Sequence, residues 1–205
     1  MMELYKRGNI FVISAPSGTG KTTLCERLLK ALPDLKMSIS HTTRKPRPGE
    51  TNGVDYFFVD KKTFEEMISK EEFIEWAEVY GNFYGTSKNV ISQLMKQGYD
   101  ILLDIDTQGA KNIKKLYPES ILIFILPPSM KELERRLLQR NEDKDTIKKR
   151  VSKAGEEISQ YKLYDYIVIN DNLEKALNEL LCIVCAERLK TKRIKHNEIE
   201  KIFTK

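Results

Sequence analysis

The sequence predicts an α/β protein with a parallel sheet core flanked by helices and a small inserted lobe of antiparallel strands. Buried runs alternate with amphipathic helices in residues 1–35 and 91–205, a pattern typical of a parallel sheet covered on both faces. Residues 36–90 break the alternation and carry hairpin signals, so we expect them to form the lobe. Hydrophobic residues make up 40% of the 205-residue chain, which is enough for a folded core.

The first core unit is a strand, a glycine-bearing turn and a helix. Residues 9–14 are rich in β-branched and aromatic side chains and predict a buried strand. Leu24, Leu28 and Leu32 recur at helical spacing, and Pro33 marks the end of that helix. The turn therefore lies at the carboxyl end of a strand, where parallel sheets bind their ligands.

The inserted lobe contains an irregular segment followed by short elements. Pro46, Pro48 and Gly49 exclude a regular helix from residues 44–52. The elements expected next are a strand at 56–59, a helix at 63–69 and strands at 73–79 and 83–86. A Gly-Asn pair at 81–82 separates the last two runs and predicts a hairpin turn.

The alternating pattern resumes after the lobe. Strands are expected at 99–103, 121–126 and 166–169, and helices at 90–95, 110–116, 133–138, 147–158 and 173–184. Leu133, Leu137 and Leu138 are expected to share the buried face of one of these helices.

Composition and charge argue against several other classes of protein. Basic residues exceed acidic ones by five, and residues 187–205 hold seven basic residues against three Glu. A solvated terminal helix fits this tail better than a nucleic-acid patch. No apolar run approaches the roughly 18 residues of a membrane span, and no export signal is evident. We expect a cytoplasmic protein without a nucleic-acid or membrane partner, and the sequence leaves a homo-oligomer open.

A phosphate-binding motif occupies the first turn. Residues 15–22 nearly match G-x-x-x-x-G-K-[ST], in which glycines let backbone N–H groups point at phosphate oxygens and the next helix adds its positive dipole end. Lys21 would reach the β- and γ-phosphates, and the Thr22 hydroxyl would bind Mg²⁺. The residues expected to hold the nucleoside triphosphate are Ala15, Pro16, Ser17, Gly18, Thr19, Gly20, Lys21, Thr22 and Thr23.

Asp104 is the second candidate for the Mg²⁺ site. It follows the apolar run at 99–103, and a carboxylate at a strand end beside a P-loop can hold the water shell of Mg²⁺. A surface turn acid is the alternative. Asp106 follows two residues later, and side chains two apart point the same way on an extended chain, which favours a site.

The segment at 40–50 points to a second phosphate. A P-loop alone names no reaction, because hydrolases, transporters and kinases all carry one. Arg44 and Arg47 flank Pro46, and two guanidiniums on a stiffened loop suit a phosphate dianion. A solvated basic loop is the alternative on composition alone.

Seven stretches together narrow the function. They are SAPSGTGKTTL at 14–24, SHTTRKPRPGE at 40–50, NGVDYFFV at 52–59, EFIEWAEVYGNFYGT at 72–86, LDIDTQGA at 103–110, ERRLLQR at 134–140 and YDYIVIND at 164–171. This pattern resembles the guanylate kinases of the bacterial nucleoside-monophosphate kinase type. The resemblance implies a GMP-binding lobe at 36–90, a helical lid at about 129–150 and transfer of the γ-phosphoryl group of ATP to GMP, and to dGMP, with Mg²⁺.

The resemblance also implies a set of GMP-binding residues. Those that resemble the clamp on the GMP phosphate are Ser40, Arg44, Arg47, Tyr56 and Tyr84, and those that resemble the guanine readers are Glu75, Thr86 and Asp106. Guanine offers N1–H and N2–H₂ donors that one carboxylate can accept together, and its O6 can accept from the Thr86 hydroxyl. Adenine would leave the Glu75 carboxylate unpaired, which favours guanine by several kcal/mol.

Arginines of the lid complete the implied site. The residues expected to act in catalysis are Lys21, Arg44, Arg136, Arg140 and Arg150, the last three by neutralising charge as the phosphoryl group moves. Surface helix charge is the alternative for the lid arginines, since acidic residues surround them. Asn141 stands where the family pattern has Gly, and Asn170 resembles the residue near the adenine or ribose of ATP.

Two alternative functions remain. A non-catalytic guanylate-kinase-like binding module would share the fold, although Lys21 and Thr22 of the phosphate motif are intact here. A P-loop kinase for another nucleotide would share that motif but would not require Glu75, Thr86 and Asp106 together.

Overall fold

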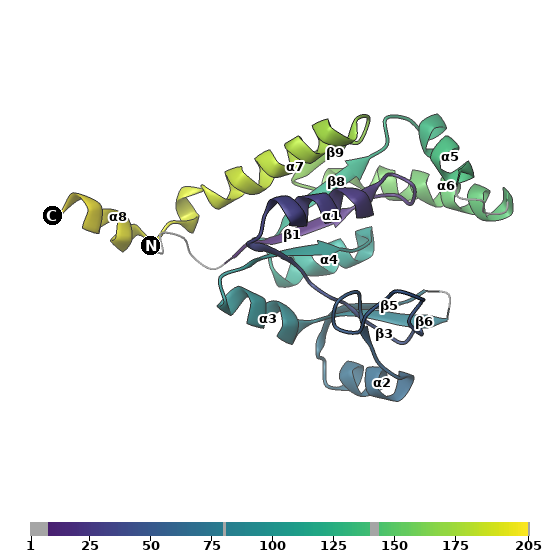
Figure 1. The fold of residues 1–205 in the computed structure, drawn as a ribbon, viewed down its shortest axis with the longest axis horizontal. Helices are drawn as coiled ribbons and strands as arrows, with labels where there is room; N and C mark the ends of the chain where they lie inside the picture. The colour runs from purple at the N-terminus through teal and green to yellow at the C-terminus, as the bar shows by residue number, and fades with distance from the viewer. Residues whose placement is uncertain (1–7, 80, 140–143, 205) are drawn as a thin grey trace.

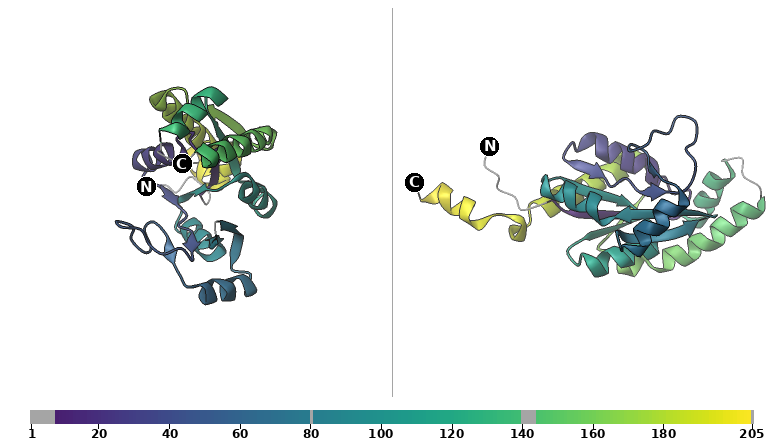
Figure 2. Two further views of the ribbon diagram at one scale, coloured as in Figure 1. Left: turned by 90° about the vertical axis from the view of Figure 1, so that its right-hand side faces the viewer. Right: turned by 90° about the horizontal axis from the view of Figure 1, so that it is seen from below.

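The fold consists of two sheets with helices packed around them (Figure 1). The computed structural model describes residues 8–79, 81–139 and 144–204. Within these residues the larger sheet has five strands and forms the core, and the smaller has four strands and forms a lobe below it (Figure 2, left view). The predicted α/β class is therefore confirmed. Nowhere in the described part of the chain is a helix long and apolar enough to cross a membrane.

The core sheet is parallel throughout and has the order β2-β7-β1-β8-β9. Its strands are β1 (Ile10–Ser14), β2 (Leu35–Met37), β7 (Asp100–Asp104), β8 (Ile121–Leu126) and β9 (Tyr166–Ile169). The inner strands are nearly all apolar because helices cover both of their faces. β2 is absent from the prediction, because a strand of three residues is too short to show a hydrophobic period.

Helices form a layer on each face of this sheet. They are α1 (Lys21–Ala31), α3 (Lys88–Lys96), α4 (Thr107–Leu116), α5 (Met130–Leu138), α6 (Lys144–Ser159), the short 3₁₀ turn η1 (Tyr161–Leu163) and α7 (Leu173–Arg188). α1 and α7 share one apolar cluster with the strands, and α3 and α4 share another. The sheet therefore separates two independent halves of the core.

The face of α5 differs from the prediction at one position. Leu133 and Leu137 are fully buried against Ile147 and Ala154 of α6, but Leu138 is 54% exposed. A step of four residues keeps Leu133 and Leu137 on one face of the helix. The next residue is turned by about 100°, which carries Leu138 toward solvent.

The lobe is a small mixed sheet with the order β4-β3-β6-β5. Its elements are β3 (His41–Thr42), β4 (Phe57–Phe58), α2 (Lys61–Ser69), β5 (Phe73–Val79) and β6 (Asn82–Ser87). β5 and β6 form the predicted antiparallel hairpin, and β4 pairs parallel with β3. The Phe64 ring stacks on Phe73 and Phe83 at 4.4 and 5.5 Å, so aromatic packing fastens α2 to this sheet.

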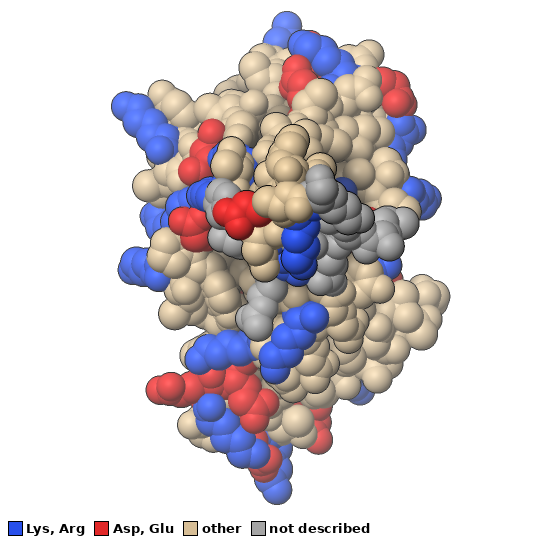
Figure 3. Space-filling view, turned by 90° about the vertical axis from the view of Figure 1, so that its left-hand side faces the viewer, with Lys and Arg blue, Asp and Glu red and all other residues tan. Residues whose placement is uncertain are grey.

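The C-terminal tail is helical, as its charge pattern predicts. It consists of the 3₁₀ turn η2 (Thr191–Arg193) and α8 (His196–Phe203), and α8 extends away from the body of the molecule (Figures 1 and 2). Basic and acidic side chains are interspersed on the face at this end (Figure 3). Phe203 is 79% exposed, so the tail contributes little to the core.

Candidate active site

The P-loop lies between β1 and α1, where the motif predicts it. Gly18 and Gly20 have φ angles of 92° and 94°, in the left-handed region that favours glycine. Gly20 precedes α1 and offers no side-chain cap, which leaves the first N–H groups of that helix available to a ligand. The buried Thr19 hydroxyl donates to the Pro16 carbonyl at 2.7 Å. The loop is therefore a fixed turn with N–H groups that suit an anion.

Asn170 supports this loop from the end of β9. Its side chain is buried, and its Nδ2 donates to the Thr19 carbonyl at 2.7 Å. A Cβ on Gly20 would lie 2.6 Å from the same nitrogen. The structure thus brings Asn170 to the P-loop, but its amide contacts the loop backbone. The exposed residues of the loop and first helical turn are Ser17, Thr22 and Thr23, and Ala15 packs against the core.

Lys21 and Asp104 form an ion pair at the carboxyl ends of two neighbouring strands. Their side chains are 21% and 26% exposed. The pair arises from topology, because β1 runs parallel to β7 and the two strands end side by side. The exposed Thr22 hydroxyl lies on the first turn of α1. Hydroxyl and carboxylate oxygens are ligands that Mg²⁺ prefers, so these residues fit the predicted metal.

Arg136 joins α5 to the P-loop. Its two terminal nitrogens donate to the carbonyls of Thr19 and Asn170, at 3.3 and 3.1 Å. Its Nε donates to Glu132 at 2.8 Å. Glu132 thereby orients Arg136, and the spacing of four residues on a helix is the signal that could have identified this pair from the sequence.

The helix α6 also reaches the P-loop. Arg150 of α6 donates to the Ser17 hydroxyl at 2.8 Å. Arg136 and Arg150 therefore approach the same loop from two different helices. Arg140, the third arginine of the predicted set, lies outside the described residues.

Glu50 holds in place the loop of the lobe that carries Arg44 and Arg47. Two nitrogens of Arg44 donate to its carboxylate at 2.8 and 3.0 Å, and the Arg47 backbone N–H donates to it at 2.7 Å. The hydrogen bond with Glu50 raises the pKa of Arg44 and lowers that of Glu50. The Arg44 guanidinium also lies 5.4 Å from the Tyr56 ring centroid. Glu50 is absent from the predicted site, because an irregular loop has no period from which such a pairing could be inferred.

The tyrosines of the predicted phosphate clamp lie together beside Arg44. The rings of Tyr56 and Tyr84 meet edge to face, with centroids 6.0 Å apart. Burial raises the pKa of Tyr56, and the charge of Asp104 adds to this increase. Ser40 is half-buried before β3, and the Arg47 side chain is exposed.

The predicted guanine readers also lie close together. Glu75 on β5 is opposite Thr86 on β6, and the Thr86 hydroxyl donates to Glu75 Oε1 at 2.5 Å. Burial raises the pKa of Glu75, the bond from Thr86 lowers it, and the charge of Asp106 raises it further. Asp106 caps α4 by accepting the Gly109 N–H at 2.8 Å. A half-buried carboxylate, a buried hydroxyl and a second carboxylate thus lie near one another, from the lobe and the core.

Glu157 of α6 was not predicted as a site residue. Burial raises the pKa of its carboxyl group, the charge of Lys153 lowers it, and those of Asp106 and Lys21 contribute with opposite signs. Glu157 pairs with Lys153, one helical turn earlier, and the Lys153 ammonium lies 3.9 Å from the Glu157 carboxylate. Its neighbour Ile158 belongs to the apolar stripe of the helix, so a helical projection would have placed Glu157 beside the buried face.

Comparison with known proteins gives the family. The guanylate kinase family model matches residues 7–187. The chain belongs to the guanylate kinase family. The guanylate kinase of Shewanella violacea is 53% identical over 185 residues, or 89% of each chain, and that of Neisseria gonorrhoeae is 53% identical over 193 residues, or 94% of each chain. The resemblance predicted from the motifs is thus confirmed.

A solved structure supports both the fold and the family. The crystal structure of guanylate kinase from Anaplasma phagocytophilum aligns with a TM-score of 0.77 at 36% identity, covering 98% of this chain and 97% of that one. The guanylate kinase family match includes every predicted site residue, from Ala15 to Asn170, and ends before η2 and α8.

Proposed function

We propose that this chain transfers the γ-phosphoryl group of ATP to GMP, and to dGMP, giving ADP and the nucleoside diphosphate. One observation carries the proposal. The Glu75–Thr86 pair lies near Asp106, two residues after the Asp104 carboxylate that pairs with Lys21 of the P-loop. Side chains that suit guanine therefore lie close to a loop that suits the phosphates of a nucleoside triphosphate.

The donor nucleotide is assigned to the P-loop. The loop N–H groups and Lys21 would bind the ATP phosphates, and Lys21 would exchange Asp104 for phosphate oxygens. Mg²⁺ would be held by the Thr22 hydroxyl and, through water, by Asp104, and it would neutralise charge on the β- and γ-phosphates. Release of Asp104 from Lys21 makes its carboxylate available for that water shell.

We assign the phosphate of the acceptor, GMP, to the loop that carries Arg44 and Arg47. A dianion presented to Arg44 would share or replace the carboxylate of Glu50, which makes two charge-assisted bonds to the same guanidinium. Tyr56 and Tyr84 would donate their hydroxyl groups, with Ser40 and Arg47 at the rim. Glu50 keeps Arg44 in a defined orientation before the substrate arrives, which lowers the entropy lost on binding.

Guanine recognition is assigned to the hairpin. The Thr86 hydroxyl donates its single proton to Glu75 Oε1, so it would have to leave that oxygen to serve guanine O6, as the sequence predicts. The second carboxylate oxygen is left for the N1–H and N2–H₂ donors of guanine. Adenine has no donor at N1 and would leave one oxygen of this half-buried carboxylate without a donor, so AMP should be a poor substrate. This selectivity concerns the base, and a 2′-hydroxyl plays no part in it, which is the reason for including dGMP.

The transfer needs alignment and charge neutralisation. The GMP phosphate oxygen would attack the γ-phosphorus in line, without a covalent enzyme intermediate. Arg136, Arg140 and Arg150 of the lid at about 129–150 would neutralise developing charge. Closure of the lid and of the lobe at 36–90 over the core at 1–35 and 91–205 would exclude the water that otherwise hydrolyses ATP.

A coupled assay tests the proposal. ADP release is measured with ATP, Mg²⁺ and each of GMP, dGMP, AMP, CMP and UMP. We expect turnover with GMP and dGMP only, and a rise in Tm with GMP in a parallel thermal scan. Binding of GMP without turnover would favour the non-catalytic module, and turnover with another monophosphate would favour a different kinase.

A further inference from the structure

Two threonines at the end of β3 bind β6 through their side chains. Thr42 is fully buried, and its hydroxyl donates to the Phe83 carbonyl at 2.9 Å. The Thr43 backbone N–H donates to the same carbonyl at 3.1 Å, and the Thr43 hydroxyl accepts the Phe83 N–H at 2.9 Å. In an antiparallel ladder that N–H would donate to a backbone carbonyl. Threonine side chains therefore continue the pairing at the point where the chain leaves the sheet.

The Thr42 hydroxyl makes a second bond, to the backbone of Arg44. Its oxygen accepts the Arg44 N–H at 3.2 Å. A threonine oxygen that accepts the N–H two residues later forms a local turn, which directs the chain out of the strand. One hydroxyl thus connects Arg44 to β6, where Tyr84 of the predicted phosphate clamp follows Phe83.

Phe83 is a fixed point in the lobe. Its ring stacks on the fully buried Phe64 with centroids 5.5 Å apart, and it meets the Trp76 ring edge to face at 5.9 Å. Such packing restrains the backbone of the residue that carries the ring. A hydrogen bond to the Phe83 carbonyl therefore places its donor relative to the aromatic core of the lobe.

Glu50 restrains Arg44 in a different way. Its carboxylate accepts two bonds from the Arg44 guanidinium and one from the Arg47 backbone N–H. Because Glu50 lies in the same loop as both arginines, these bonds orient the guanidinium within the loop but do not tie the loop to β6. The Thr42 hydroxyl supplies that connection, because it contacts the Arg44 backbone and the Phe83 carbonyl together.

We propose that Thr42 is a positioning residue for the acceptor phosphate, because its hydroxyl sets the Arg44 backbone against the strand that carries Tyr84. This inference rests on the proposed function, in which Arg44 and Tyr84 bind the phosphate of GMP. Groups that are held in place before binding lose less conformational freedom when the ligand arrives. Valine has nearly the same shape as threonine but can neither donate nor accept, so Thr42→Val removes both bonds.

Kinetics of matched threonine variants test the proposal. Thr42→Val should raise the KM for GMP about tenfold and change the KM for ATP by less than about twofold, since one restraint on the GMP site is lost. Thr42→Ser keeps the hydroxyl and should bring the KM for GMP back to within about twofold of the parent value. Thr43→Val removes a bond to Phe83 but none to Arg44, and should raise the KM for GMP by less than about twofold. The coupled ADP-release assay measures each KM with the other substrate saturating.

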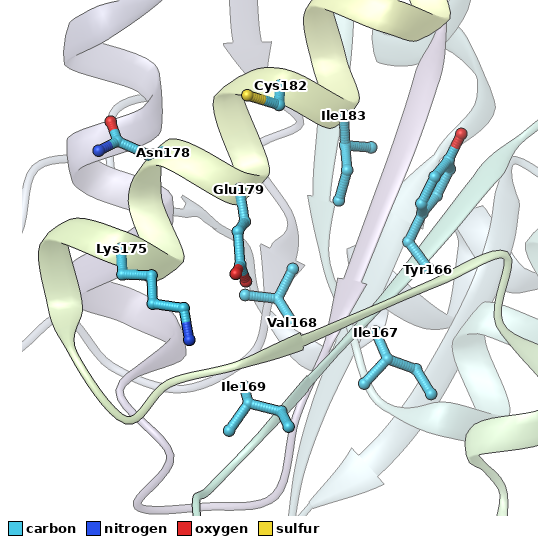
Figure 4. A pocket seen from close by; sticks show the side chains of 9 residues that line it. All are labelled: Tyr166, Ile167, Val168, Ile169, Lys175, Asn178, Glu179, Cys182 and Ile183. Carbon is cyan, nitrogen blue, oxygen red and sulfur yellow. The ribbon is translucent and has the colours of Figure 1, made fainter.

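A remote variant separates positioning from loss of stability. Ile183 packs against the core cluster and lines a groove of about 760 Å³ between β9 and α7, away from the lobe (Figure 4). Ile183→Ala should lower Tm, because it removes packed methyl groups, and should leave the KM for GMP unchanged. An equal increase in the KM for GMP in Ile183→Ala and Thr42→Val would overturn the proposal, because it would trace the effect to stability.

A double-mutant cycle tests whether Thr42 acts through Arg44. In an Arg44→Lys background, Thr42→Val should raise the KM for GMP by less than about a further twofold, because the group that it positions is already altered. Independent effects that multiply, equal effects of Thr42→Val and Thr43→Val, or an impaired Thr42→Ser variant would overturn the proposal. Absence of GMP turnover in the parent protein would overturn the proposed function. GMP turnover with an unchanged KM in Thr42→Val would overturn this inference alone.

Discussion

The Thr86 hydroxyl donates a 2.5 Å hydrogen bond to Glu75 Oε1 across the β5–β6 hairpin. Thr86 is fully buried, and the bond fixes the carboxylate through a neighbouring strand. One oxygen of Glu75 is therefore occupied by the protein, and the other remains for a ligand. Because an ionised carboxylate only accepts hydrogen bonds, this free oxygen suits a ligand that presents hydrogen-bond donors.

Glu75→Gln should weaken GMP use more than ATP use. The amide keeps one acceptor for Thr86 but presents an NH₂ group to the two donors of guanine, which replaces attraction by repulsion. The loss of a charged hydrogen bond corresponds to a KM for GMP that is about 10- to 100-fold higher. Steady-state kinetics with each substrate varied in turn measures this. Glu78→Gln, on the exposed side of the same strand, is the control, and an unchanged KM for GMP would remove Glu75 from the base site.

The same substitution predicts a pH-dependent change in stability. Burial raises the pKa of Glu75 above its ordinary value of 4.5, so the folded state favours the protonated carboxyl group. The stability that this group contributes is fully present below pH 4.5 and is lost as the pH rises through the higher folded pKa. Glu75→Gln does not ionise. Urea unfolding should show the variant gaining stability relative to the parent protein from acid to neutral pH, and a difference independent of pH would contradict the assignment.

Lys21→Met should abolish phosphoryl transfer while the fold persists. The substitution removes the ammonium that pairs with Asp104 and that would contact the transferred phosphate. Loss of one such charge lowers kcat by about 10²- to 10³-fold. Lys30→Met, at the exposed end of the same helix, is the control in the coupled assay. Turnover close to that of the control would show that Lys21 does not act on the phosphates.

The strands and the catalytic motif could be predicted from the sequence because their signals are local. The strands at 121–126 and 166–169 are observed with the predicted bounds, and the P-loop connects a strand to a helix as its motif requires. Glu50 and Glu157 could not be assigned in this way. The contacts of Glu50 lie in an irregular loop that has no period. A helical projection places Glu157 beside a buried face, but it does not show which residues of the core that face meets.

The strand β2 and the side chain of Leu138 also could not be predicted from local sequence patterns. β2 has only three residues, and it is a strand because Leu35 pairs with Asp100, far away in the chain. Leu138 looks like a core residue in composition, but the helical phase set by Leu133 and Leu137 turns it outward. Long-range pairing and exact helical phase therefore decide what local patterning leaves open.

Arg44→Lys should impair GMP binding although it keeps the positive charge. A guanidinium can meet a carboxylate or phosphate with two parallel bonds, as Arg44 does with Glu50, whereas an ammonium acts as a point charge. We expect the KM for GMP to increase about tenfold, with a smaller effect on the KM for ATP. Arg27→Lys, at the α1–α7 contact, is the control. Equal kinetics for the two variants would show that the bidentate geometry is not used.

Gly20→Ala should destabilise the P-loop, whereas Gly155→Ala should not. At a φ of 94° an alanine costs about 1–2 kcal/mol, and its Cβ would lie 2.6 Å from the Asn170 amide that supports the loop. Gly155 lies within α6, and a Cβ added there would meet no heavy atom within 4 Å, so alanine should stabilise the helix by about 0.5–1 kcal/mol. Urea unfolding of both variants measures the difference, and ATP binding should fall only for Gly20→Ala. If both substitutions shift stability in the same direction, the contact between Asn170 and Gly20 does not constrain the loop.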